Sequence, residues 1–221
     1  NILIVGCGAR ESAMIDHLLQ FKENNVFGYI PYCHPAFAGR IEYRIFSSDD
    51  VDFKECYDYC KEKDIRYVVI GSENYIKTGL GDYLEGFNEG ITCISPSTMG
   101  AQIETSKYFA RKILDENGLS KYNPNYILVN KQTPFVNIQD FIEVHNNNVV
   151  VKANGLYSGK GVKVYGIDMF SKTEVLDNIY TILKKNDFVV LERRIQSQNE
   201  FSLISFTDSE TTQHSFPIKD F

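Results

Sequence analysis

The 221-residue sequence lacks several features that mark membrane, nucleic-acid-binding or fibrous proteins. It has no tryptophan, no run of Lys and Arg, and no apolar stretch close to the roughly 20 residues that span a bilayer. A net charge of −6 leaves no cationic surface for non-specific binding to nucleic acid or anionic membranes. We therefore expect neither partner, and any phosphate that the protein binds must be held by a local site.

The five cysteines include no CxxC pair, and no His lies nearby at zinc-ligand spacing. They predict reduced thiols in a cytoplasmic protein. Cys56 and Cys60 lie one helical turn apart and could share a metal with a further ligand, but burial as small apolar residues is the favoured interpretation. The chain begins at Asn1 with no cationic segment before its first apolar run, so we expect no signal peptide and a sequence trimmed at its ends.

Alternating strand and helix patterns predict a doubly wound parallel sheet over residues 1–97, within an α/β fold. The first unit is a βαβ, with strands at Ile2 to Val5 and Val26 to Ile30 around a helix at Glu11 to Lys22. The further elements expected in this region are a helix at Asp50 to Lys63, a strand at Tyr67 to Ile70, a helix at Leu80 to Glu89 and a strand at Thr92 to Ile94.

A second unit of mixed strands and helices is predicted after a linking helix. Ser97 is a suitable N-cap for that helix, residues 98–118, which ends near Gly118. From Leu119 onward the patterns no longer alternate strictly, which predicts an α+β arrangement. The expected strands are Tyr126 to Val129, Val149 to Lys152, Val162 to Tyr165 and Phe188 to Leu191, and the expected helices are Ile138 to His145 and Lys172 to Lys184.

The first chemical motif is Gly6-Cys7-Gly8-Ala9-Arg10-Glu11, where the first strand turns into the first helix. Small residues there allow close backbone approach to an anion at the helix start. A nicotinamide site is disfavoured, because Glu11 stands at the third glycine and Tyr29-Ile30-Pro31 stand where an acid should hold the ribose. A tight turn without a ligand is the alternative.

The second motif, Lys152 to Val162, is a Gly-rich turn between two predicted strands with a lysine on each side. It is not a Walker loop, because Gly155 is one residue too close to Gly159-Lys160 and Gly161 replaces the magnesium-binding Ser or Thr. The chemistry is nevertheless similar, since glycines fold the main chain over phosphates while lysines neutralise their charge. A solvated hairpin with incidental lysines is the alternative.

The third motif is the apolar strand Phe188 to Leu191, which runs into Glu192 and is followed by a polar loop and Glu200. Such strand ends offer backbone groups to a purine edge and carboxylates to ribose hydroxyls. Together with the two-lysine loop, this arrangement indicates ATP.

These segments, in this order, resemble the phosphoribosylamine–glycine ligase (glycinamide ribonucleotide synthetase) family of ATP-grasp enzymes. The matching segments cover the whole chain: Ile4 to Glu11 resembles V-x-G-x-G-x-R-E, Gly71-Ser72-Glu73 with Gly79 resembles G-P-E-x-P-L-x-x-G, Ser95 to Lys107 resembles G-P-x with A-x-L-E-x-S-K, Lys152 to Val162 resembles K-A-D-G-L-A-x-G-K-G-V, and Asp208 to Asp220 resembles a strand pair ending in Q-D.

The resemblance implies four parts: a pre-ATP-grasp domain at 1–97, a linker helix at 98–118, an ATP-grasp lid at 119–190, and the first strands of the main ATP-grasp subdomain at 191–221. It implies ATP-dependent ligation of glycine to 5-phosphoribosylamine through glycyl phosphate, in purine biosynthesis. It also implies Mg²⁺, with its ligands beyond Phe221, and fusion to or association with other purine-pathway domains.

By position, the resemblance also assigns site residues, though no catalytic residue. Those implied to bind ATP are Lys107, Lys152, Gly155, Ser158, Gly159, Lys160, Gly161, Glu192, Arg193, Ile195 and Glu200. Those implied to bind substrate are Gly8, Arg10, Glu73 and Asp220. Glu192 and the backbone of 193–195 would meet adenine and ribose, and 155–161 would form a loop over the phosphates.

Several positions depart from the family pattern. Ser12 stands at a family His, Asn154 at a family Asp, and Arg193-Arg194 at an acidic and apolar pair. A Gly-rich loop of many relatives is missing between Asn186 and Asp187, by deletion or because a segment is not included. Three interpretations remain: part of a longer ligase, which is favoured; a non-catalytic relative that binds nucleotide or a partner; or an ATP-grasp ligase with another substrate.

The loop assignment predicts that Lys160→Ala weakens ATP binding, because the lysine would neutralise phosphate charge. Calorimetric titration with magnesium-ATP measures the change, and an unchanged affinity would count against the assignment.

Overall fold

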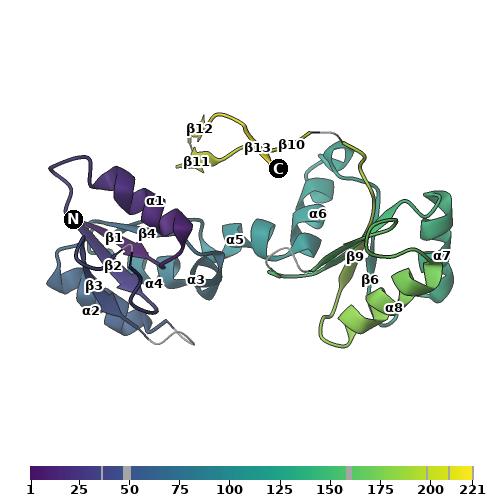
Figure 1. The fold of residues 1–221 in the computed structure, drawn as a ribbon, viewed down its shortest axis with the longest axis horizontal. Helices are drawn as coiled ribbons and strands as arrows, with labels where there is room; N and C mark the ends of the chain where they lie inside the picture. Colours follow the sequence, from purple (N-terminus) through teal and green to yellow (C-terminus); the bar gives the residue numbers. More distant parts are fainter. Residues whose placement is uncertain (36, 47–50, 158–160, 198, 209, 221) are drawn as a thin grey trace.

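The computed structural model describes residues 1–221 except 36, 47–50, 158–160, 198, 209 and 221. Figure 1 shows two lobes joined by α5 (Thr98–Thr105) and α6 (Lys107–Glu116), with the C-terminal strands lying beside the junction. None of the helices in these described ranges is long and apolar enough to cross a membrane.

The N-terminal lobe is the predicted doubly wound sheet. Its described strands are all parallel, in the order β3-β2-β1-β4-β5. They are β1 (Ile2–Val5), β2 (Val26–Ile30), β3 (Glu42–Ile45), β4 (Tyr67–Ile70) and β5 (Thr92–Ile94). The helices of this lobe are α1 (Ala9–Leu18), α2 (Phe53–Glu62), α3 (Glu73–Thr78) and α4 (Leu80–Glu85). The predicted strands are confirmed, whereas β3 and α3 were not predicted.

The central strand β1 is apolar throughout because both of its faces are buried. Leu3 and Val5 pack into a core with α2 and α4, while Ile4 packs on the opposite face with Ile15 of α1. Cys56 and Cys60 are completely buried free thiols in the first of these cores, which confirms their interpretation as small apolar residues.

The predicted single linking helix is instead two helices, α5 and α6, divided at Ser106. Ser97 caps α5 as predicted, its hydroxyl accepting a hydrogen bond from Gly100 N at 3.1 Å. Ser106 has extended backbone angles (φ −134°, ψ 107°), and its hydroxyl accepts from Phe109 N at 3.1 Å, so it caps α6. The break places Lys107 in the first turn of a new helix.

The second lobe contains an antiparallel sheet in the order β6-β9-β7-β8 within the described residues. The strands are β6 (Tyr126–Val129), β7 (Val149–Ala153), β8 (Val162–Val164) and β9 (Val189–Arg193). A short 3₁₀ turn, η1 (Ser120–Tyr122), precedes them. Helices α7 (Phe135–Val144) and α8 (Lys172–Leu183) pack with alternate residues of β7 and β9, including Val151 and Leu191, to form the core of this lobe.

The opposite face of this sheet positions the functional residues. Side chains alternate between faces along a strand. Because Val151 and Leu191 face the core, Lys152 of β7 and Glu192 of β9 lie on the other face, against which α6 packs.

The chain ends in two short ladders. β10 (Glu200–Ser202) pairs with β13 (Ile218–Asp220), and β11 (Ser205–Thr207) pairs with β12 (Thr212–His214), both antiparallel. Strands β12 and β13 lie within 208–220, where a strand pair was expected, but β12 pairs with β11 and β13 with β10 instead of with each other. The ladder of β10 and β13 sets Glu200 opposite Asp220 in the backbone register.

The turn between β1 and α1 is built around the buried carboxylate of Glu11, which is 3% exposed. Gly8 N donates a hydrogen bond to Glu11 Oε2 at 2.6 Å. A Cβ atom at Gly8 would lie 2.8 Å from the same oxygen, and a Cβ at Gly71, just after β4, would overlap Oε1. Glu11 therefore fills the space that these glycines leave, and joins the first turn to the neighbouring strand.

We predict that Gly71→Ala lowers the free energy of unfolding by about 1–3 kcal/mol, because the added methyl group overpacks the site of a buried carboxylate. Urea unfolding measures the change. Gly100→Ala is the matched control, since a Cβ in that helix meets only ordinary contacts, 3.5 Å away, and Ala favours the helix. Equal stability of Gly71→Ala and the wild type would contradict the proposed packing.

Candidate nucleotide and substrate site

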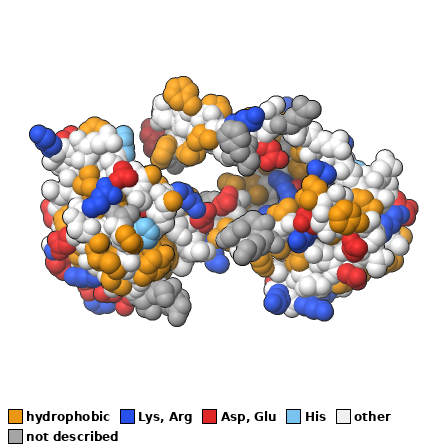
Figure 2. Space-filling view, in the orientation of Figure 1, with side chains coloured by type: hydrophobic (Ala, Val, Ile, Leu, Met, Phe, Trp, Pro, Cys, Tyr) orange, Lys and Arg blue, Asp and Glu red, His pale blue; other side chains and the backbone are white. Residues whose placement is uncertain are grey.

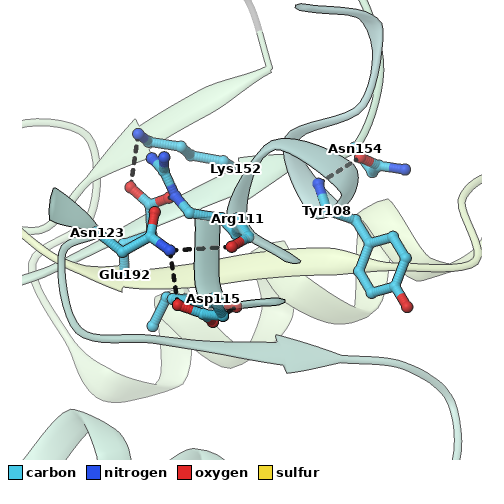
Figure 3. A network of polar contacts seen from close by, with 8 residues as sticks. Tyr108, Arg111, Asp115, Asn123, Lys152, Asn154 and Glu192 are labelled. Atoms are coloured by element: carbon cyan, nitrogen blue, oxygen red, sulfur yellow. Dashed lines mark hydrogen bonds and ion pairs between the residues drawn. The ribbon is translucent and has the colours of Figure 1, made fainter. Parts of the chain in front are cut away.

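An ion-pair network lies where α6 meets the sheet of the second lobe (Figure 3). Glu192 is 3% exposed and receives a cation on each oxygen. Arg111 Nε lies 2.7 Å from Oε1, and Lys152 Nζ lies 2.6 Å from Oε2. The two cationic side chains are about one quarter exposed, so they connect the buried acid to the surface.

Further polar contacts hold the far end of this network. Asn123 Nδ2 donates to the backbone oxygen of Arg111 and to Asp115 Oδ1, both at 2.9 Å (Figure 3). The Tyr126 hydroxyl donates to the other Asp115 oxygen. The hydrogen bond from Tyr126, followed by that from Asn123, holds the pKa of Asp115 below its usual value. These contacts fix α6, and with it Arg111, against the edge strand β6.

A second group of contacts fixes the start of α6. Asn154, just after β7, accepts from Tyr108 N at 3.1 Å (Figure 3). It also accepts from the Ser106 hydroxyl at 3.1 Å. Lys107 Nζ donates to the oxygen of Gly155 at 2.9 Å. Burial lowers the pKa of Lys107, and the charge of Lys152 lowers it further. The charges of the two lysines thus act on each other, and Glu104 and Glu192 are carboxylates that act on Lys107 in the opposite direction.

A cavity of about 260 Å³ lies beside Lys107, between the lobes. It is lined by Glu73, Asn74, Glu104, Lys107, Gly155, Leu156 and Tyr157. Figure 2 shows the surface hollowed between the lobes, with cationic side chains inside the hollow. Lys107 and the backbone of Gly155 in this wall can bind a phosphate group, and Glu73 and Glu104 add two carboxylates to the same lining.

A second cavity, of about 320 Å³, lies over the turn between β1 and α1. Its lining includes Gly8, Arg10, Glu11, Tyr32 and Tyr75. Arg10 Nη2 lies 2.9 Å from both carboxylate oxygens of Glu73, at the first position of α3. Burial raises the pKa of Glu73, but hydrogen bonds from its own backbone N–H and from Arg10 outweigh that effect and leave the pKa below its usual value.

Two family models match consecutive parts of the chain. The model described as phosphoribosylglycinamide synthetase, N domain, matches residues 1–104, and the ATP-grasp (A) domain of the same synthetase matches residues 105–221. The chain belongs to the phosphoribosylglycinamide synthetase family. The match confirms the family and the ATP-grasp fold that the motifs predicted.

The names of individual proteins that are similar to this chain agree with this family. A phosphoribosylamine–glycine ligase from Methanocorpusculum labreanum is 32% identical over 212 residues, which are 95% of this chain and 46% of that protein. A trifunctional purine biosynthetic protein adenosine-3 from Drosophila pseudoobscura pseudoobscura is 29% identical over 233 residues, covering 100% of this chain and 16% of that protein. The chain thus spans about half the length of the curated ligase.

Among solved structures, the ADP complex of N5-carboxyaminoimidazole ribonucleotide synthetase (purK) superposes with a TM-score of 0.69 at 20% identity. The match covers 100% of this chain and 54% of that one. At this identity the likeness extends to the fold alone.

The residues that the synthetase resemblance assigned to ATP fall into three groups. Lys107, Lys152, Gly155 and Glu192 lie together around the network and the first cavity. Arg193, Ile195 and Glu200 follow Glu192 and are exposed, and Gly161 packs so closely on Tyr157 that a Cβ there would lie 2.7 Å from Tyr157 Cβ. Ser158, Gly159 and Lys160 lie outside the described residues.

The residues assigned to substrate lie partly together. Gly8 and Arg10 line the second cavity, and Glu73, which pairs with Arg10, lines the first. Glu73 is the first residue of α3. Asp220 lies on β13, and only its backbone is described. The roles of all these residues remain predictions.

Arg111, which pairs with Glu192, was not among the predicted site residues. A signal was available, because Arg111 lies four residues after Lys107 and residues at that spacing share a helix face.

We predict that Asn154→Ala lowers the free energy of unfolding by about 1–3 kcal/mol, because Tyr108 N–H and the Ser106 hydroxyl lose their acceptor. Asn154→Asp retains an acceptor oxygen and costs less than Asn154→Ala. Urea unfolding compares them, with Asn137→Ala on the exposed face of α7 as the control. If Asn154→Ala unfolds at the same urea concentration as the control, the contact does not stabilise the helix start.

Proposed function

We propose that this chain forms part of an ATP-dependent ligase that joins glycine to 5-phosphoribosylamine, giving glycinamide ribonucleotide, ADP and phosphate. The observation that carries the proposal is the continuous match to the synthetase family over the N and ATP-grasp domains. The charge arrangement supports it, since Lys107 and Lys152 lie near the cavity between the lobes.

In the proposed reaction a glycine carboxylate oxygen attacks the γ-phosphorus of ATP, ADP leaves, and glycyl phosphate forms. The amine of phosphoribosylamine then attacks the carbonyl carbon, phosphate leaves, and the amine loses a proton. Lys107 and Lys152 bind the phosphates and offset their charge. The loop at 155–161 covers them and excludes water from the acyl phosphate.

The remaining assigned residues position the ligands. Glu192, the backbone of 193–195 and Glu200 bind adenine and ribose. Gly8, Arg10, Glu73 and Asp220 bind phosphoribosylamine and glycine, and the exposed guanidinium of Arg10 is available to the sugar phosphate once Glu73 releases it.

Magnesium is assigned no residue, because no group of His, Cys, Asp and Glu side chains in the described part of the chain is placed to hold a metal. The free thiols support the expected cytoplasmic location. The multifunctional relative supports fusion to other purine-pathway domains.

The test uses the full-length protein as its gene encodes it, with magnesium-ATP, glycine and 5-phosphoribosylamine. ADP formation should require both substrates, and mass spectrometry should detect glycinamide ribonucleotide. ADP formation without phosphoribosylamine would indicate another substrate, and no ATP binding would indicate a non-catalytic relative.

We predict that Lys152→Gln lowers kcat/KM for ATP by about 10²–10³, the loss typical when one preorganised donor to developing charge is removed. Lys163→Gln is the matched control on the neighbouring strand β8, where the lysine lies 3.4 Å from Asp168. Equal activity of the two variants would contradict the assignment of Lys152 to the phosphate site.

A further inference from the structure

The described structure uses Lys152 for an interaction that nucleotide binding must disturb. Its ammonium group lies 2.6 Å from Glu192 Oε2, yet the proposed function requires that group at a phosphate. Glu192 is almost completely buried and cannot recover hydration when the lysine turns away. A buried carboxylate that loses its partners carries a large desolvation penalty.

Arg111 removes this conflict. Its Nε lies 2.7 Å from the other carboxylate oxygen, Oε1, so Glu192 retains one cation when Lys152 leaves. A guanidinium keeps its charge at any pH at which the protein is folded, and therefore remains a counter-ion throughout. Because the Asn123 hydrogen bond ties the Arg111 backbone to Asp115, the helix holds this cation in place independently of the nucleotide.

We propose that Arg111 is a positioning residue that neutralises Glu192 and thereby releases Lys152 to bind a nucleotide phosphate. This inference rests on the proposed function. It assigns Arg111 no contact with the nucleotide. Without Arg111, Lys152 is the only counter-ion of Glu192 among the described residues, and its transfer to the phosphate leaves that carboxylate without an ion-pair partner there.

The test is the affinity of the full-length protein for ATP, measured by calorimetry. Arg111→Gln should weaken binding at least about tenfold, or about 1.4 kcal/mol. Arg111→Lys restores a cation beside Glu192 and should bind within about threefold of the wild type. Lys112→Gln is the control, because it removes a positive charge from an exposed position on the same helix. In the described residues, the one ion pair of Lys112 is with Glu116, at 3.4 Å. This variant should change the affinity for ATP less than twofold.

A double-mutant cycle with Glu192→Gln separates this role from direct binding or from structure. Once the buried charge is gone, Arg111 has nothing to neutralise, so adding Arg111→Gln to Glu192→Gln should change ATP affinity less than about twofold. Equal losses in both backgrounds would overturn the inference, as would an unchanged affinity of Arg111→Gln in the wild-type background.

The double variant also covers a failure of Arg111→Gln to fold, because it buries no unpaired carboxylate. If the double variant binds ATP tenfold more weakly than Glu192→Gln alone, the inference is overturned even when Arg111→Gln alone does not fold. A wild-type protein that binds no ATP would instead overturn the proposed function itself, which distinguishes the two failures.

Discussion

The burial of the Glu192 carboxylate constrains the whole second lobe. β9 lies between β6 and β7 and Glu192 lies where α6 packs on this strand, so its carboxylate does not reach solvent and must be neutralised by neighbouring elements. Lys152 supplies one cation from the adjacent strand, and Arg111 supplies the other from a helix that precedes the sheet in sequence. Replacing a buried ion network by packed apolar side chains is often neutral or stabilising. Stability alone therefore does not explain this network, whereas the proposed role in holding and releasing Lys152 does.

The first lobe also contains a buried carboxylate that neighbouring elements hold in place. Glu11 and Glu192 are the two charged residues that are fully buried in the described part of the chain, and each lies at a proposed ligand site. Glu11 is held by the Gly8 backbone and fits only because Gly8 and Gly71 carry no side chain. This explains why the chain has Glu where a dinucleotide-binding turn has its third glycine. The carboxylate fills the space over the turn and forms part of the lining of the second cavity.

The elements with strong periodicity were predictable, and those without it were not. β1 and β4 are buried apolar runs that the sequence pattern identified. β3 was missed because Glu42 and Arg44 give it a polar pattern, which suits its position at the sheet edge. The break between α5 and α6 was missed because apolar residues continue at helical spacing through Ser106, whose cap and whose contact with Asn154 override that pattern. The motifs could assign Lys107 and Lys152 to the proposed phosphate site. Arg111 has the pattern of a surface residue on an amphipathic helix, and only the fold shows that Glu192 lies beneath it.

The fold also determines on which face of the sheet Arg193, the first residue of the unusual pair Arg193-Arg194, lies. Side chains alternate along β9, so Arg193 lies on the face opposite Glu192, and its register partner is the fully buried Val149. Burial, and then the charge of Arg193, lowers the pKa of His145, which follows α7 on that same side. Arg193 therefore adds positive charge behind the sheet rather than in the region of Lys107 and Lys152. Under the proposed function, it is therefore the backbone of 193–195, and not the Arg193 side chain, that would contact adenine.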